Sequence, residues 1–335
     1  MLTINNTMIK GISCVVPSMK INNIDLSQIY GEKETLKLIA SIGVNTRYVA
    51  DKMITTSDLC FNAANNLLSA LNWDPKDIGA IIFVSQTSDY QLPATSCILQ
   101  HKLGLPETAM AFDVNLGCSG YVYGLKIASS LVNAGIEKVL LLVGDTISKI
   151  IKPGDRSTEF LFGDAGSATA LQYDKNNTLH FELGSDGAGW ENIVARQLIY
   201  SNASRGANNS FLEMNGAEVF TFTLKTVPPL VNNFLKKLNM SSNDIDVCIY
   251  HQANLFILKH LSKKSNLKPE QVPISIDEYG NTSCASIPLT LCTRKQEKYK
   301  KTLLVGFGVG LSWGTAMCDL SETLLLPVEV LENGQ

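Results

Sequence analysis

The chain repeats part of its own sequence pattern, and this repeat limits the folds that it can adopt. Leu71–Val84 and Leu238–Tyr250 each begin with Leu-Asn, continue through Asp-Ile and end in an apolar run. Lys138–Gly144 and Lys301–Gly306 form a second similar pair in the same order. Leu238 lies 167 positions after Leu71, and Gly306 lies 162 positions after Gly144, about half of the 335 residues in each case. Such a duplication predicts two related halves, which we expect at residues 1–175 and 176–335.

Each half is predicted to alternate amphipathic helices with short apolar strands. The helices are expected at Ser57–Leu71, Cys118–Asn133, Phe220–Leu238 and Asn254–Ser265, and the strands at Ala80–Val84, Val139–Val143, Val247–Tyr250 and Thr302–Val305. Continuous apolar runs are typical of strands buried on both faces, as when helices cover a sheet, so the pattern predicts an α/β layered fold. Pro228 and Pro229 predict a kink or break in the third helix. The polar segment 174–209 is expected to form loops.

The composition is typical of a well-packed globular enzyme. Apolar residues make up 45% of the chain and charged residues 18%, which fits a globular chain better than a disordered one. The net charge of −3 gives no electrostatic footprint for nucleic acid. The N-terminus does not resemble a signal peptide, and no run reaches the roughly 18 apolar residues of a membrane span. The eight cysteines form no Cys-x-x-Cys pair and the four histidines have no metal-ligand spacing, so we expect a cytoplasmic protein without a metal.

Cys118 lies in a glycine-flanked turn, Asn115–Gly120, between an apolar run and an amphipathic helical pattern. A cysteine at such a strand-to-helix corner is predicted to lie at or next to the helix N-terminus. The unpaired N–H groups and the helix dipole there favour an anion, which lowers a thiol pKa and makes a thiolate nucleophile. The alternative is a small buried residue in a tight turn, since free cysteine often packs as a hydrophobe.

Two further polar residues follow predicted buried elements in the second half. His251 comes directly after the strand that ends at Tyr250, and Asn281 follows Gly280. His251 has an ordinary interpretation as a polar residue after a strand, and Asn281 has one as a turn residue that tolerates a left-handed conformation. However, catalytic groups gather at strand ends in α/β folds. Asn281 also lies 163 positions after Cys118, so the duplication places it opposite the cysteine.

Taken together, these motifs resemble the β-ketoacyl-acyl-carrier-protein synthase III family of thiolase-fold condensing enzymes. The resemblance runs from about Ile9 to about Leu320 and includes the Cys118 turn, His251–Asn254, Gly280–Ser283 and Gly308–Gly314. It implies a homodimer whose two duplicated halves form a five-layer α-β-α-β-α stack. It also implies a transferase of fatty acid biosynthesis or a related pathway, with acyl-CoA and acyl-carrier protein as substrates and no resident cofactor.

The resemblance assigns catalytic roles to Cys118, His251 and Asn281. A thiolate of Cys118 takes an acyl group from a thioester, giving an acyl-enzyme. Decarboxylation of a malonyl thioester then leaves an enolate, which the neutral donors His251 and Asn281 would stabilise. The enolate attacks the acyl carbonyl, whose oxyanion would be held by the backbone N–H groups of Cys118 and Gly310. Gly310 suits that position because a missing Cβ permits close backbone approach.

Several family positions that bind coenzyme A or a carrier protein differ in this sequence. Lys37 and Ser41 stand where housekeeping members have the tryptophan and arginine that hold the nucleotide. Two basic positions of the carrier-docking surface are Thr221 and Phe256 here. These differences predict a donor preference that departs from acetyl-CoA.

Four substrate contacts are implied by the same resemblance. Arg156 keeps a basic family position, although a solvated loop charge is the ordinary alternative. Leu92 replaces a bulky aromatic residue that limits the acyl chain across the dimer. Met214 and Gly216 are expected beside the substrate.

Two other functions remain open at the level of sequence. An acyltransferase of the same fold would pass the acyl group to an oxygen or nitrogen nucleophile without decarboxylation, and the presence of Asn281 favours condensation over that reaction. A non-enzymatic partner subunit would be expected to lack Cys118 or His251, and both are present. We therefore expect a condensing enzyme.

Overall fold

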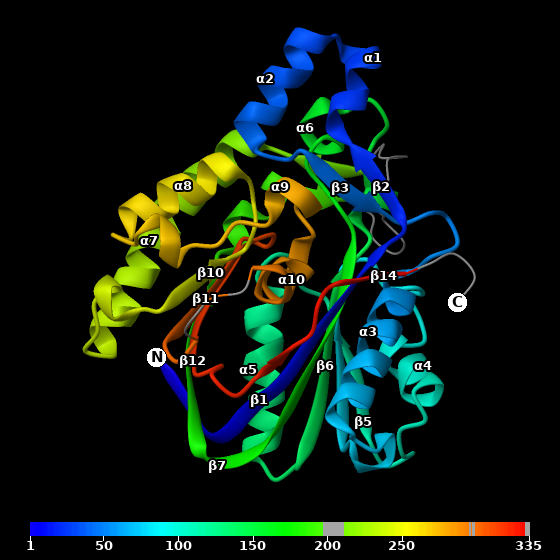
Figure 1. The fold of residues 1–335 in the computed structure, drawn as a ribbon, viewed down its shortest axis with the longest axis vertical. Helices are drawn as coiled ribbons and strands as arrows, with labels where there is room; N and C mark the ends of the chain where they lie inside the picture. Colours follow the sequence, from blue (N-terminus) through cyan, green and yellow to red (C-terminus); the bar gives the residue numbers. More distant parts are fainter. Residues whose placement is uncertain (197–210, 295, 297–298, 332–335) are drawn as a thin grey trace.

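The computed structural model describes residues 1–196, 211–294, 296 and 299–331 as a mixed α/β protein (Figure 1). Its strands are β1 Leu2–Pro17, β2 Met19–Asn22, β3 Thr46–Val49, β4 Ala80–Val84, β5 Met110–Val114, β6 Lys138–Asp145, β7 Ala165–Ser185, β8 Ile193–Ala195, β9 Leu212–Met214, β10 Val247–Tyr250, β11 Thr302–Gly308, β12 Ser312–Cys318, β13 Leu324–Leu325 and β14 Glu329–Leu331. Its α-helices are α1 Ser27–Tyr30, α2 Glu32–Ile42, α3 Thr56–Leu71, α4 Thr95–Lys102, α5 Gly120–Asn133, α6 Arg156–Glu159, α7 Gly216–Lys237, α8 Leu255–Lys264, α9 Ile276–Tyr279 and α10 Ser286–Thr293.

The strand pairing follows the same order twice. In the first copy, β5 and β4 run parallel to β6, which pairs antiparallel with β7, and β7 pairs antiparallel with β1. In the second copy, β10 runs parallel to β11, which pairs antiparallel with β12, and β12 pairs antiparallel with β7. The strand β7 serves both copies, because its first part pairs with β6 and its last part with β12. The expected boundary between residues 175 and 176 lies inside this strand and stays a prediction.

The local structure of the two copies also matches at the repeated sequence. Asn72 ends α3 and Asn239 follows α7, and both adopt a left-handed backbone, with φ of 52° and 55°. Asparagine tolerates that conformation better than most residues. After each of them comes a 3₁₀ turn and then the buried strand β4 or β10. The repeat therefore fixes the same helix end, turn and strand in both halves.

Helices cover the strands in five layers, as the thiolase-like α-β-α-β-α prediction requires. Helix α3 packs on β1, β6 and β7, whereas α5 and α10 lie between the first and second groups of strands. Helices α7 and α8 pack on each other, and α7 covers β11 and β12 on the far side (Figure 1). Strands β4, β10 and β11 are buried along their whole length, which explains their continuous apolar sequences. The fold-class prediction is confirmed.

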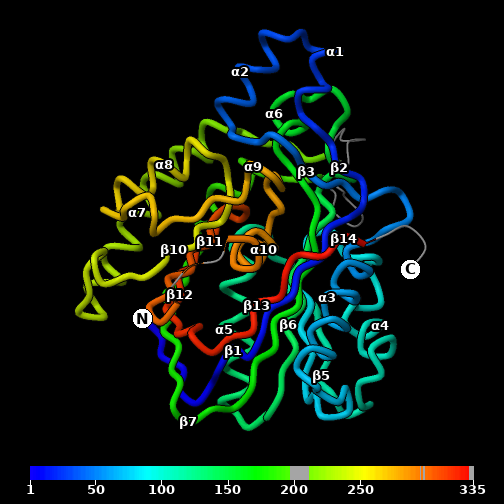
Figure 2. The backbone as a smooth tube through the Cα atoms, in the orientation of Figure 1, coloured from blue at the N-terminus to red at the C-terminus, as the bar shows by residue number. Residues whose placement is uncertain are grey.

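The N-terminal strand β1 and the C-terminal strands β13 and β14 lie side by side. Strand β1 carries β13 and β14 in parallel along its outer edge, and Figure 2 shows the C-terminal trace following the N-terminal strand. Because β1 also pairs with β7 over most of its length, both of its edges are occupied at Gly11–Ile12 and Val15–Pro17. This part of the strand is closed to pairing with another chain.

One local expectation is wrong and a second is wrong in part. The segment 174–185 is not a loop but the second part of β7, where Leu179, Phe181 and Leu183 alternate with more polar residues. Residues 197–209 of the same expected loop lie outside the described residues. Helix α7 continues through Pro228 and Pro229 without the predicted break, and the kink that was the alternative stays a prediction. Buried Val227, Val231, Phe234 and Leu235 pack that helix into a hydrophobic cluster with β10 and β11, and this tertiary packing outweighs the lost backbone hydrogen bonds.

Candidate active site

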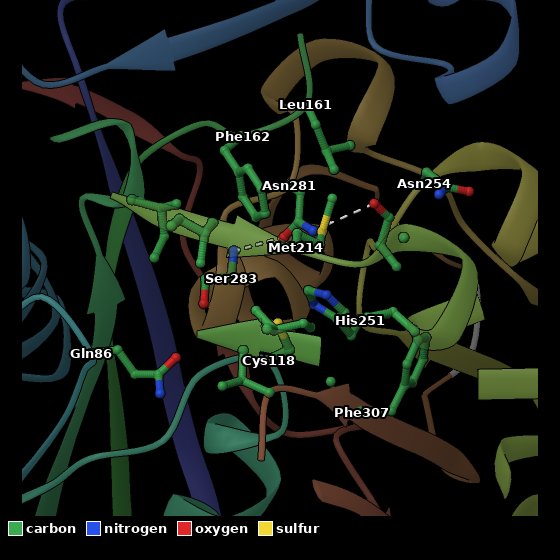
Figure 3. A pocket seen from close by; sticks show the side chains of 18 of the residues that line it. Gln86, Cys118, Leu161, Phe162, Met214, His251, Asn254, Asn281, Ser283 and Phe307 are labelled. Carbon is green, nitrogen blue, oxygen red and sulfur yellow. Dashed lines mark hydrogen bonds between the residues drawn. The ribbon is translucent and has the colours of Figure 1, made fainter. Parts of the chain in front are cut away.

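Cys118, His251 and Asn281 line one cavity of about 250 Å³ (Figure 3). Cys118 lies two residues before α5 begins, His251 directly follows β10, and Asn281 comes two residues after α9. The structure thus brings together three residues that are separated by up to 163 positions in sequence. The first half contributes one of them and the second half contributes two.

The end of β11 lies flat against the Cys118 side chain. A Cβ atom added to Gly308, whose φ is +151°, would lie 2.9 Å from the Cys118 sulfur, and one added to Gly306 would lie 2.9 Å from Cα of Ser119. The backbone N–H of Val309 donates a hydrogen bond to the Cys118 sulfur. Glycine is therefore required at Gly308, because any side chain would occupy the space of the thiol.

The pKa of Cys118 differs from the sequence expectation of a lowered value. The pKa of the Cys118 thiol is raised to about 11, mainly by burial and to a smaller extent by the charge of Asp145. Hydrogen bonds from the Val309 N–H and the Ser283 side chain lower this pKa but do not offset the desolvation. The resting cysteine is therefore a protonated thiol, because desolvation outweighs the field at the start of α5.

His251 is neutral in the cavity. Its side chain is buried, and burial lowers the pKa of the imidazole to about 3, although a hydrogen bond to the Ser283 carbonyl raises it slightly. Nδ1 lies 2.7 Å from the Ser286 hydroxyl, which also accepts the backbone N–H of Gln252 at 3.4 Å. This arrangement favours a Ser286 hydroxyl that donates to Nδ1 and leaves the hydrogen on Nε2. The edge of Phe307 fixes the ring from the other side, with ring centroids 5.4 Å apart.

The amide of Asn281 has a fixed orientation. Its Oδ1 accepts the backbone N–H of Ser283 at 2.9 Å, and its Nδ2 donates to the Ala253 carbonyl at 3.4 Å. The backbone of Asn281 also pairs with Leu161 and Gly163 of the first half, at 2.8 and 3.1 Å. Because Oδ1 is engaged, the NH₂ group is the part of the amide that remains for a ligand in the cavity. His251 and Asn281 are thus two neutral hydrogen-bond donors beside one thiol.

Only some of the predicted substrate contacts reach this cavity. Met214 and Gly216 line it, at the end of β9 and the start of α7. Arg156 does not, because it begins α6 with its side chain 55% exposed, 3.9 Å from the Glu34 carboxylate and over the Tyr30 ring. Leu92 is also absent from the lining and is 76% exposed on the loop before α4.

The position predicted for the second oxyanion donor also changes. Gly310 does not line the cavity, whereas Gly308 and Val309 do. The N–H group that faces the Cys118 sulfur belongs to Val309. The sequence offers three possible N–H donors in Gly308–Gly310. It does not indicate which of them faces the sulfur, because that depends on where β11 ends.

The sequence analysis missed most of the cavity wall. Apolar side chains from six separate segments form it, and generic apolar residues carry no motif: Ile147, Ile150, Leu161, Phe162, Ile193, Leu212, Val219 and Ile257. Gln86 and Asn115 add two amides close to the cysteine turn. The sequence feature that could have indicated Gln86 is Gly117, the glycine before Cys118, because a Cβ on Gly117 would lie 2.3 Å from Oε1 of Gln86.

The altered family positions lie on the outer surface. Lys37 and Ser41 are exposed on α2, and Thr221 is exposed on α7. Phe256 on α8 is half-exposed and stacks on Phe220, with ring centroids 5.4 Å apart. An aromatic surface thus occupies a position where the resemblance implied a basic residue.

The described part of the chain contains no group of three or more histidine, cysteine or acidic residues arranged to hold a metal ion. None of its helices combines the length and apolar character needed to cross a bilayer. The eight cysteines are all free thiols, seven of them buried.

The fold and the cysteine-histidine-asparagine cavity define a thiolase-fold condensing enzyme, and comparisons with known proteins agree. Residues 112–187 match the family model for 3-oxoacyl-[acyl-carrier-protein] synthase III, and residues 235–320 match the model for its C-terminal part. The chain is similar to the β-ketoacyl-[acyl-carrier-protein] synthase III of Clostridioides difficile, with 35% identity over 92% of this chain and 97% of that protein. The corresponding Clostridium tetani protein is 34% identical over 90% of this chain and 95% of its own length.

A solved structure extends the comparison to the whole fold. The crystal structure of 3-oxoacyl-(acyl-carrier protein) synthase from Burkholderia xenovorans superposes with a TM-score of 0.94 and 40% sequence identity, covering 98% of each chain. The chain therefore belongs to the β-ketoacyl-acyl-carrier-protein synthase III family.

Proposed function

We propose that this enzyme condenses an acyl thioester primer with malonyl-acyl-carrier protein, releasing carbon dioxide and forming a β-ketoacyl thioester. The observation that carries the proposal is the single cavity shared by the Cys118 thiol, His251 and the Asn281 amide. The relatives named β-ketoacyl-[acyl-carrier-protein] synthase III support the same reaction. Malonyl-acyl-carrier protein is thus the proposed extender and partner.

The first half-reaction moves the acyl group to Cys118. The sulfur attacks the carbonyl carbon of the primer thioester, the carbon–sulfur bond of the donor breaks, and the thiol proton ends on the departing thiolate. The backbone N–H of Val309, which already faces the sulfur, and that of Cys118 would donate to the oxyanion of the tetrahedral intermediate. Because the pKa of the Cys118 thiol is about 11, the resting cysteine is protonated, and formation of the thioester depends on these donors.

The second half-reaction uses the two neutral donors. Nε2–H of His251 and the Asn281 NH₂ group would bind the thioester oxygen of the malonyl unit. Loss of carbon dioxide places negative charge on that oxygen, and preorganised donors stabilise it without reorganisation. The enolate carbon then attacks the acyl carbonyl, the bond to Cys118 breaks, and the cysteine thiolate takes up a proton. A neutral imidazole suits this role because it donates without bringing a buried charge.

The setting of the reaction is also part of the proposal. We place the enzyme in the cytoplasm as a homodimer, with acyl-CoA or acyl-carrier protein as primer donor and no resident cofactor. Exposed Tyr90 and Leu92 on one loop support a subunit contact there, since neighbouring large apolar side chains on a surface commonly mark interfaces. Lys37 and Ser41 support a primer donor other than acetyl-CoA, because neither can stack on adenine as tryptophan does.

Intact-mass spectrometry and carbon dioxide release test the proposal together. The wild-type protein should gain one acyl mass from a matching donor, and should release labelled carbon dioxide from malonyl-acyl-carrier protein. Cys118→Ser should lose the thioester adduct, whereas Cys97→Ser, which changes an exposed cysteine, should keep it. Acylation without carbon dioxide release, with transfer to an oxygen or nitrogen nucleophile, would instead identify an acyltransferase. An adduct that persists in Cys118→Ser would refute the acyl-Cys118 intermediate.

A further inference from the structure

Gln86 differs from the other polar side chains of the cavity. Among them, His251 bonds to Ser286, the Asn281 amide bonds to Ser283 and Ala253, Thr223 bonds to Val219, and Asn254 caps α8 through Ile257. Within the described residues, no group forms a hydrogen bond with the carboxamide of Gln86. Asn115 shares this property, but it lies exposed at the rim. Gln86 lies on the cavity wall with its side chain partly buried, so its carboxamide is free to form hydrogen bonds with a ligand group.

The position of this carboxamide is fixed by its backbone. The Gln86 N–H donates to Oδ1 of Asp145 at 2.7 Å, and the hydroxyls of Ser85 and Thr87 donate to the same oxygen at 3.0 Å each. Asp145 is fully buried, so the loop after β4 is held at three consecutive residues. The Gln86 side chain therefore projects into the cavity from a rigid base.

The carboxamide lies close to the acyl attachment point. Its Oε1 is 2.3 Å from the place where a Cβ of Gly117 would lie, and Gly117 immediately precedes Cys118. Figure 3 shows Gln86 and Phe307 on opposite sides of Cys118, with His251 toward the Phe307 side. An extender held by His251 would thus approach from that side, leaving the Gln86 side for the first carbons of the acyl group.

The charges of the cavity restrict the ligand group further. None of the side chains that line it within the described residues is an aspartate, glutamate, lysine or arginine, and His251 is neutral. A carboxylate or ammonium on the acyl group would be buried without a counter-charge, which is costly. A simple alkyl chain would leave the Gln86 carboxamide desolvated and unpaired, which is also unfavourable.

We propose that the primer acyl group carries a neutral hydrogen-bonding substituent near its thioester, a hydroxyl or carbonyl oxygen, and that the Gln86 carboxamide binds it. This inference rests on the proposed acyl-Cys118 intermediate and names the class of primer that forms it. Both groups suit Gln86, because a carboxamide can donate to a carbonyl and can also accept from a hydroxyl.

Single-turnover loading of Cys118 tests this substrate class. The probes are N-acetylcysteamine thioesters of butyrate, 3-hydroxybutyrate, 3-oxobutyrate and succinate, so that neither coenzyme A nor a carrier protein contributes to selectivity. The wild-type protein should load the hydroxy or oxo acyl group about fivefold faster than butyryl, the ratio that one hydrogen bond of ordinary strength provides. Succinyl should load more slowly than either.

Gln86→Met keeps the length of the side chain and removes its hydrogen-bonding groups. In this variant the hydroxy-to-butyryl ratio should fall to about one, whereas Gln28→Met, at an exposed position on α1, should keep the wild-type ratio. Wild-type loading of butyryl at the rate of the hydroxy and oxo probes, or faster, would overturn the inference even if Gln86→Met did not fold. An unchanged ratio in Gln86→Met would overturn it as well. Failure of Cys118 to load from any probe, carrier protein or acyl-CoA would instead refute the proposed function itself.

Discussion

Gly308→Ala is the sharpest test of how the cavity is built. The added Cβ would lie 2.7 Å from Cβ of Cys118 and 2.9 Å from its sulfur, and Gly308 has a φ of +151° that residues with side chains rarely adopt. Carbon and sulfur atoms normally lie about 3.5–4.0 Å apart, so the two side chains would overlap by about 1 Å. Overpacking of this kind costs about 1–3 kcal/mol, and backbone strain adds about 1–3 kcal/mol.

The same overlap should damage catalysis more than stability. The Cys118 thiol must move away from the Val309 N–H, and a misplacement of about 1 Å costs about 100-fold in rate. Urea unfolding would measure the loss of stability, and single-turnover acylation followed by mass spectrometry would measure loading in the folded variant. Gly187→Ala is the matched control, because a Cβ there would meet nothing within 4 Å. Loading of Gly308→Ala at the wild-type rate would refute the packing of β11 against the thiol.

Three further predictions concern the two half-reactions and the buried titratable groups. Asn281→Ala should still form acyl-Cys118 but release carbon dioxide from the malonyl thioester about 100- to 1000-fold more slowly; equal loss of both would contradict the division of roles. The loading rate should rise about tenfold per pH unit from pH 7 to 9, because the pKa of Cys118 is about 11, and a plateau near pH 7 would indicate a stable thiolate. Because the pKa of His251 is near 3 when folded and 6.5 when unfolded, its protonation destabilises the folded state as the pH falls below 6.5. From pH 6.5 to 5, wild type should lose about 2 kcal/mol of stability relative to His251→Gln, and parallel pH curves would count against a neutral imidazole.

The strands were predictable where burial leaves a simple signal. Ala80–Val84 and Val247–Tyr250 are observed with the predicted bounds, since a continuous apolar run is required when helices cover both faces of a sheet. The second part of β7 was missed although Leu179, Phe181 and Leu183 alternate with more polar residues. Its many polar residues and the turn-forming asparagines before it concealed a period of two, which a half-buried strand should show.

The site was predictable only in its reactive residues. Cys118, His251 and Asn281 follow recognisable turns or strands, but the wall around them is drawn from segments whose meeting depends on the whole fold. The choice of Val309 over Gly310 depends on where β11 stops, which no local pattern encodes. Arg156 and Leu92 are exposed outside the cavity, whereas Met214 and Gly216 line it, although the same resemblance implied all four substrate contacts.

The prediction of a lowered Cys118 pKa failed for a reason that clarifies the chemistry. The helix-terminus argument treats the field of α5 alone, but the thiol is also removed from water and lies near the buried Asp145 charge. Burial acts on His251 in the opposite direction, so both members of the resting pair are neutral. A neutral pair avoids the cost of burying an ion pair in a cavity lined mainly by apolar side chains. Negative charge then develops only where donors already lie, at the Val309 N–H during acyl transfer and at His251 and Asn281 during decarboxylation. The site therefore stabilises transient oxyanions in preference to a permanent thiolate.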